Sequence, residues 1–241
     1  MLNKFQYKAL YSPVTLVFLP VFLVAGIFSI ELKTFLPVAF GTLFPFIIPF
    51  FMIQTGGTRG KALEKGLWQE WGGMPSVQML RWRDKTINTL TKTRIHQKLQ
   101  QICPVPLPPT EAMEFNDSLQ ADEVYETWSD HVRMNTRDTN VYPMLFMELI
   151  NYNFRRNMLG LKGTAFFVII LLMAALYGGC AGLTHSFNPL NFPPTFFYAL
   201  IGLILIMIIW LSVVKKSWVR KSAIGYALQL YESALRLSNL Y

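Results

Sequence analysis

The sequence predicts an all-α integral membrane protein in which two transmembrane hairpins, four helices in all, flank a helical cytoplasmic insert. Three observations carry this prediction. Four long apolar stretches lack charged side chains, they are grouped as two pairs, and the polar middle between the pairs holds most of the basic residues. Crossing the hydrocarbon core of a bilayer takes roughly 20 helical residues, which each stretch can supply.

The first pair of stretches predicts a hairpin over 1–54. No Asp, Glu, Lys or Arg occurs in Ala9–Ile30 or in Thr34–Thr58. Each stretch holds one crossing, and we place the spans at 12–30 and 34–54. A second apolar run follows the first within a few residues, and no small-residue cleavage pattern separates them. We therefore expect the first span to be retained and not removed as a signal peptide.

The second hairpin is predicted over 163–214, where charged residues are again absent. This stretch is long enough for two crossings. A polar turn at His185–Pro189 interrupts it near the middle. The expected spans are therefore 163–183 and 195–214.

The distribution of Lys and Arg predicts the orientation of the spans, because cytoplasmic loops carry an excess of these residues. Fourteen basic residues lie between Arg59 and Lys162, whereas the turn between the third and fourth spans has none. Four more follow the last span within Lys215–Lys221. We expect both termini and the middle segment to lie in the cytoplasm.

The residue types within the predicted spans limit the transport functions that the protein could have. None carries Asp, Glu, Lys or Arg at mid-depth, which argues against a pump or a proton-coupled transporter. A channel function is still compatible with these spans, because pores can be lined by hydroxyls, carbonyls and apolar constrictions. Prolines of the first hairpin either curve packed helices or form a hinge in a pore-lining helix. The candidate pore or hinge residues are Pro37, Thr42, Pro45, Pro49 and Gln54.

The middle segment, 55–162, is predicted to be a helical domain, and a C-terminal helix is predicted within 215–241. Apolar spacing, glycine and proline set the expected boundaries. Thr110 follows a four-proline linker and is a candidate helix cap. The amphipathic C-terminal helix packs either on this insert or on a neighbouring copy. The expected helices of the insert are 61–71, 75–102, 121–135 and 142–159, the last ending at a glycine break over 160–163.

Charge is split within the insert. Residues 59–98 have a net charge of +6 and residues 111–138 a net charge of −6. One interpretation is that the two halves pack together with opposite charges facing each other or water. The other is a basic surface for phosphates of a nucleotide, nucleic acid or lipid headgroup, with Trp82 as a stacking face. The residues of that surface are Arg81, Arg83, Lys85, Lys92, Arg94, His96 and Lys98.

No catalytic or metal-binding constellation is predicted. The histidines lack a ligand-spaced partner, and Cys103 and Cys180 fall on opposite sides of the predicted membrane, so they cannot pair within one chain. We therefore expect no enzyme activity, no cofactor and no metal.

Four segments carry a resemblance. They are Trp71–Ser76 (WGGMPS), Leu80–Asp84 (LRWRD), Tyr142–Phe146 (YPMLF) and Asn151–Lys162 (NYNFRRNMLGLK). Together they resemble a pattern in bacterial four-span membrane proteins of unassigned function, over roughly residues 55–163 of this chain. The layout is also similar to that of four-span membrane effectors in bacterial antiphage systems. This resemblance implies a multi-pass protein of the bacterial inner membrane and brings no catalytic residue with it.

The functional expectation is an oligomeric channel or pore-forming effector in antiphage defence, gated through its cytoplasmic domain. The alternative is a non-conducting sensor or scaffold that recruits a soluble effector. Expected partners are the lipid bilayer, further copies of the chain, a soluble protein and a nucleotide or nucleic-acid signal. Arg155 and Arg156 lie shortly before the third span. We expect one of three roles for them: binding lipid headgroups, pairing with acidic residues of the insert, or binding an anionic signal. The candidate ligand or partner contacts are Arg81, Arg83, Lys85, Arg94, Arg155 and Arg156.

Overall fold

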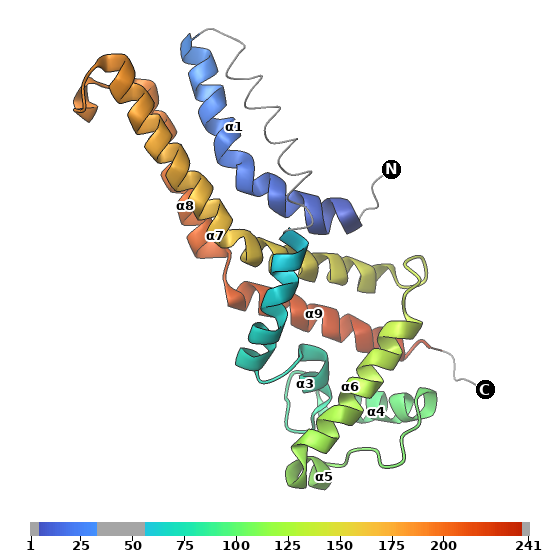
Figure 1. The fold of residues 1–241 in the computed structure, drawn as a ribbon. Coiled ribbons are helices and arrows are strands. Elements are labelled where there is room, and N and C mark those ends of the chain that lie inside the picture. Colours follow the sequence, from blue (N-terminus) through green and yellow to red (C-terminus); the bar gives the residue numbers. More distant parts are fainter. Residues whose placement is uncertain (1–4, 33–55, 238–241) are drawn as a thin grey trace. The chain divides into compact units, whose positions relative to one another are not determined.

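A computed structural model describes residues 5–32 and 56–237, and all the regular elements in these ranges are helices (Figure 1). The chain divides into two compact units. The apolar unit comprises Met1–Leu63 and Asn153–Trp218, and the polar unit comprises Glu64–Tyr152 and Val219–Tyr241. Each unit is built from chain segments that are distant in sequence.

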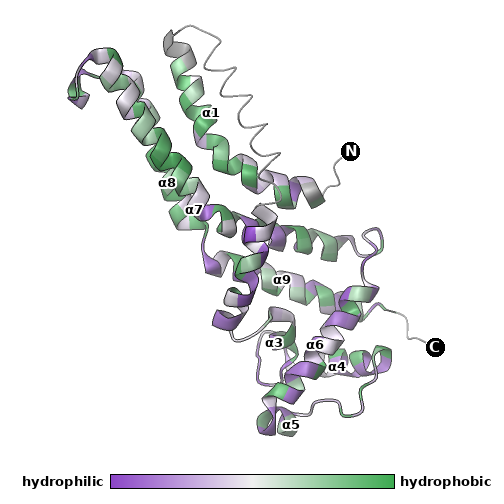
Figure 2. Cartoon of the chain, in the orientation of Figure 1, coloured by the Kyte–Doolittle hydropathy of each residue, from purple (hydrophilic) through white to green (hydrophobic). Residues whose placement is uncertain are grey.

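Among the described residues, three helices are long and apolar enough to cross a membrane, and they cover Tyr7–Phe28, Pro143–Thr184 and Pro194–Val213. Figure 2 shows the apolar character of α1, of α8 and of the later part of α7. The predicted span 163–183 lies within the second of these helices, and the predicted spans 12–30 and 195–214 overlap the first and the third but extend two residues and one residue beyond their ends. The predicted span 34–54 lies outside the described residues. The elements concerned are the π-helix η1 (Gln6–Tyr11), α1 (Ser12–Leu32), α7 (Pro143–Thr184) and α8 (Pro194–Val213).

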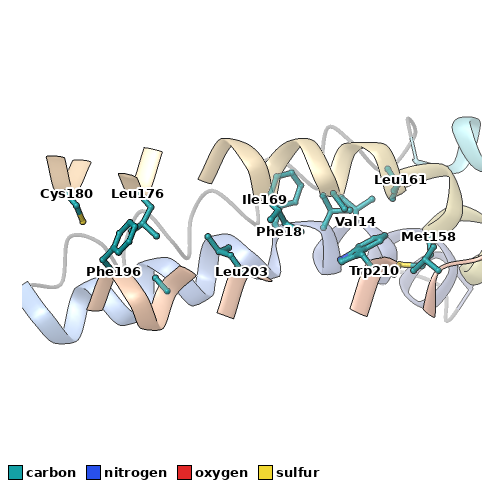
Figure 3. Packing of buried hydrophobic residues seen from close by; sticks show 14 of the residues in the cluster. Val14, Phe18, Met158, Leu161, Ile169, Leu176, Cys180, Phe196, Leu203 and Trp210 are labelled. Carbon is teal, nitrogen blue, oxygen red and sulfur yellow. The ribbon is translucent and has the colours of Figure 1, made fainter. Parts of the chain in front are cut away.

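A single hydrophobic cluster holds the apolar unit together (Figure 3). Val14 and Phe18 of α1, Leu161 of α7, and Leu203 and Trp210 of α8 are all buried in it. Outside this cluster the helices present apolar side chains to their surroundings, and only 22% of the α8 window is buried. Such a surface is a liability in water and the normal state in lipid.

The predicted turn between the last two spans is confirmed. α7 ends at Thr184, and His185 adopts a left-handed backbone with φ of 51°. The Asn188 side chain accepts a hydrogen bond of 3.1 Å from Leu190 N–H and caps the short 3-10 helix η2 (Pro189–Asn191). Tyr177 Oη donates to the Phe187 carbonyl at 2.7 Å, which fastens the turn to α7.

The predicted break at 160–163 is wrong, because α7 runs unbroken from Pro143 to Thr184. Glycine weakens a helix by about 1 kcal/mol but does not end it where packing compensates. At Gly160 the reason is a close crossing: a Cβ atom built there would lie 2.8 Å from the backbone nitrogen of Gly60. Glycine at 160 therefore serves helix packing and not helix termination.

The polar unit is a bundle of mostly short helices (Figure 1). The predicted helix 121–135 is confirmed by α6, which starts a turn earlier. Thr110 caps α5, as expected, by accepting from Met113 N–H at 3.2 Å. The elements are the end of a helical segment over 56–71, α3 (Pro75–Leu80), α4 (Thr89–Ile102), α5 (Glu111–Asn116), α6 (Ser118–Asn135), the start of α7 and most of α9 (Lys216–Ala234).

The predicted single helix 75–102 is wrong, because a loop over 81–88 separates α3 from α4. Two short polar side chains stabilise this loop locally. Asp84 Oδ1 accepts from Thr86 N–H at 2.8 Å, and Asn88 Oδ1 accepts from Thr91 N–H at 2.8 Å and caps α4. Such local bonds compete with helix continuation.

The C-terminal helix α9 packs on its own chain in the polar unit. Its Leu230 and Tyr231 are buried with Leu80, Leu99 and Trp128 in the second hydrophobic cluster. Tyr231 Oη donates to the Ser76 carbonyl at 2.7 Å. Of the two alternatives for this helix, the described residues therefore show the one in which it covers the insert.

Candidate functional site

The segment Trp71–Ser76 forms a tight turn between the helical segment 56–71 and α3. Gly72 and Gly73 both have positive φ, of 84° and 132°, a backbone that residues with a Cβ rarely adopt. Gly73 N–H donates to the Trp68 carbonyl at 2.7 Å. Pro75 then begins α3 at a position where its missing N–H costs nothing.

Arg81 clamps this turn to α6. Its guanidinium forms a two-pronged ion pair with Asp122, with Nε–Oδ1 at 2.8 Å and Nη2–Oδ2 at 2.6 Å. Nη1 donates to the Gly72 carbonyl at 2.8 Å. The side chain is 11% exposed. Bidentate pairs of this kind fix geometry strongly, so Arg81 holds the first two motif segments together.

A cavity of about 450 Å³ adjoins this clamp, between the helical segment 56–71, the glycine turn and α6. Its charged lining residues are Lys65, Arg81, Asp122 and Glu126. Two cations and two anions give the cavity no net charge. It therefore offers no general attraction for an anion such as a phosphate.

Glu114 of α5 organises the loop between α3 and α4. This carboxylate is 4% exposed and accepts hydrogen bonds from Trp82 N–H at 2.7 Å and from Tyr125 Oη at 2.9 Å. It also lies 3.6 Å from Arg83 Nε. Burial, together with the hydrogen bond to Glu114, raises the pKa of Tyr125. The loop is thus fixed to a residue from the acidic half of the insert.

Lys92 supports the same loop from the α4 side. Its Nζ donates to the Arg81 carbonyl and, at 2.5 Å, to the Asp84 carbonyl. Burial lowers the pKa of Lys92, while the charges of Asp84 and Glu114 act in the opposite direction. A lysine predicted as part of an exposed basic surface is therefore an internal cap for loop carbonyls.

A second cavity, of about 700 Å³, lies along α4, and we call it the glutamine groove. One wall comes from the proline linker and the start of α5, residues 108–111. The other wall comes from the loop and α4. Its residues are Trp82, Thr93, His96, Gln97, Gln100 and Gln101. Cavities of this size are typical of small-molecule sites.

His96 lies between the groove and an aromatic cluster. Its ring centroid is 4.5 Å from that of Trp82, 5.6 Å from Tyr125 and 5.4 Å from Trp128. Nε2 lies 2.8 Å from the Leu80 carbonyl, which can only accept, so Nε2 carries the proton. Burial lowers the pKa of His96 to about 4, against the opposing effect of that hydrogen bond. His96 is therefore neutral at physiological pH, and Nδ1 is an acceptor.

The residues of the predicted basic surface thus occupy different environments. Arg81 and Arg83 pair with Asp122 and Glu114, which joins the basic half of the insert to its acidic half. Lys85 and Arg94 are exposed. The split of charge along the sequence indicated that the two halves could pair, but it did not identify the individual partners, which lie about 30 to 40 positions apart along the chain.

Residues 153–162, most of the segment Asn151–Lys162, have a different role, at the junction of several helices in the apolar unit. Asn157 Nδ2 donates to the Ala9 carbonyl at 2.8 Å, and Lys162 Nζ donates to the Val214 carbonyl at 2.8 Å. Arg155 Nη1 donates to the Trp218 carbonyl at 3.1 Å, and its guanidinium carbon lies 5.1 Å from the centroid of that indole. Arg156 is buried beside Asn157. Polar residues of this segment hold neighbouring helices by their backbone carbonyls.

The candidate pore or hinge residues Pro37, Thr42, Pro45, Pro49 and Gln54 lie outside the described residues. Within 5–32 and 56–237, no group of three or more His, Cys, Asp or Glu side chains is arranged to hold a metal ion.

Comparison with protein-family models, with curated proteins and with solved structures finds no match to this chain. Its function is therefore argued from its own geometry.

Proposed function

We propose that this protein is an oligomeric channel or pore-forming effector of a bacterial inner membrane, gated by its polar unit in the cytoplasm. The observation that carries the proposal is α7. This helix begins in the polar unit at Pro143 and continues without a break to Thr184 in the apolar unit. A change in the polar unit can therefore act on a membrane helix through continuous backbone hydrogen bonds.

Oligomerisation is part of the proposal, because a few helices from one chain rarely enclose a water path. Support comes from the apolar side chains that α7 and α8 leave uncovered, such as Phe167 at 67% and Ile201 at 55% exposure. Copies of the chain and lipid are the two surroundings that suit such a surface. The layout predicted from the sequence is similar to that of four-span membrane effectors in antiphage systems, and we therefore expect that opening permeabilises the membrane of an infected cell.

A second candidate is a non-conducting sensor or scaffold that holds a soluble effector at the membrane. One observation favours it: the polar unit exposes Phe115 at 91% and Leu119 at 77%. Large apolar side chains at such exposure suit a protein partner.

Flux from proteoliposomes separates the two candidates. The full chain is reconstituted, and release of entrapped ions is measured with and without cell lysate from phage-infected bacteria as a source of signal. The channel predicts flux that increases with the signal, together with an oligomer in native mass spectrometry. Absence of flux in both conditions, with a soluble protein that co-purifies in stoichiometric amount, would replace the channel with the scaffold.

A further inference from the structure

We propose that the glutamine groove binds a nucleobase, with adenine as the best-fitting base. This inference rests on the proposed function, because it names the ligand class by which the polar unit would be controlled. The residues that line the groove all belong to the polar unit.

The hydrogen-bonding face of the groove comes from α4. Thr93, Gln97 and Gln101 recur every four residues and so lie one above the other along one side of the helix. Gln97 and Gln101 are exposed, and neither has a hydrogen-bond partner among the described residues. A glutamine amide offers a donor and an acceptor side by side, which matches N6 and N7 of adenine.

The groove also offers an aromatic face. Trp82 is half-buried, its Nε1 donates to the Pro109 carbonyl at 2.9 Å, and its ring meets His96 edge to face. The ring is therefore held in place before any ligand arrives. Any nucleobase can stack on an aromatic face, and a ring that is already fixed loses little conformational entropy on binding.

Charge distinguishes a base site from a phosphate site. Glu111 is the one formally charged side chain among the residues that line the groove, and no Lys or Arg lines it. His96 also lines the groove and is neutral at physiological pH. A nucleotide would thus place its base in the groove and its phosphate outside the groove, in solvent.

The groove has the structural features of a site and not of a packing defect. Gln100 donates to the Val105 carbonyl at 2.9 Å and accepts from Val105 N–H at 3.3 Å, so its amide ties α4 to the proline linker. Thr110 caps α5 at the other end of that wall. Both walls are fixed by hydrogen bonds, while the two outer glutamines stay available.

Isothermal titration of the full chain in lipid nanodiscs tests the proposal. The probes are AMP, a six-residue oligoadenylate and, as the phosphate control, ribose 5-phosphate. AMP or the oligoadenylate is expected to bind with a Kd of about 1 mM or tighter, and ribose 5-phosphate is expected to bind at least tenfold more weakly. Preference for AMP indicates a free nucleotide, and preference for the oligomer indicates a single-stranded nucleic acid.

The variant Gln97→Ala with Gln101→Ala is expected to weaken binding by about tenfold, since two hydrogen bonds are lost. Both side chains are exposed, so folding is not at risk. Gln120→Ala, an exposed glutamine of α6 outside the groove, is the matched control and keeps full affinity.

Two results would overturn the proposal: no heat of binding from either adenine probe, or equal affinity in the double glutamine variant. Binding without ion flux would leave the site in place and favour the scaffold. Flux without adenine binding would leave the channel in place and remove this site.

Discussion

The motif segments of the polar unit and those of the apolar unit have different structural roles. In the polar unit, residues 71–84 build a turn and a loop whose side chains form ion pairs and border two cavities. In the apolar unit, residues 153–162 send their polar groups to backbone carbonyls of other segments. A motif of the first kind supports a ligand site, whereas one of the second kind fixes helix packing. The difference predicts how each segment responds to substitution.

The largest expected effect is in the first region, at Glu114. Replacement by Ala leaves Trp82 N–H and Tyr125 Oη without their acceptor in a buried position. We expect Glu114→Ala to lower the free energy of unfolding by about 3 kcal/mol, because each stranded buried group costs about 1–3 kcal/mol. Thermal unfolding in detergent, followed by tryptophan fluorescence, measures the change. Glu111→Ala, an exposed neighbour on the same helix, is the control and should unfold like the parent.

Glu114 also illustrates what sequence can and cannot predict. Three of the four predicted spans correspond to apolar helices among the described residues, and the turn at 185–189 is also present, because hydropathy and turn residues are local signals. The loop over 81–88 was missed because Leu80, Ile87 and Leu90 keep a helical spacing across it. The local bonds of Asp84 and Asn88 favour the loop, but its contacts with Glu114 and Lys92 depend on the fold. The spacing of Gln97 and Gln101 on α4 was visible in the sequence, but the opposite wall of the groove was not.

The second-largest expected effect, also in the polar unit, is a dependence of folding stability on pH. The pKa of His96 is about 4 in the folded protein and 6.5 when the group is unperturbed. As pH falls below 6.5, the unfolded state takes up the proton first, so folding is progressively destabilised. The loss approaches about 3 kcal/mol at pH 4.

Unfolding midpoints between pH 7.5 and pH 4 measure this effect. His96→Gln should flatten the profile, while His131→Gln should keep the slope of the parent. An identical slope in the His96→Gln variant would assign the acid sensitivity to other groups.

In the apolar unit, we expect two glycines of α7 to differ in how their replacement by alanine changes stability. A Cβ at Gly160 would lie 2.8 Å from the Gly60 backbone nitrogen, and backbone cannot move aside as a side chain can. Gly160→Ala should therefore destabilise the apolar unit by about 1–3 kcal/mol. At Gly163 no neighbouring atom of the described residues lies within 4 Å of the added atom. Gly163→Ala should be neutral or stabilise the helix by up to about 1 kcal/mol.

The unfolding midpoint of each glycine variant in detergent checks this pair. Equal destabilisation by both substitutions would mean that α7 needs flexibility at these positions, and the interpretation of Gly160 as a packing residue would fail.

The smallest effect separates two asparagines of the second motif. Asn157 is buried and donates to the Ala9 carbonyl at 2.8 Å, so Asn157→Ala removes the partner of a carbonyl in η1. We expect a loss of about 1 kcal/mol. Asn151 is exposed, and Asn151→Ala should change stability by no more than about 0.5 kcal/mol. If this motif only packs helices, Asn157→Ala also leaves nucleotide affinity unchanged, because the groove lies in the other unit. A loss of affinity in that variant would mean that the second motif contributes to ligand recognition as well as to helix packing.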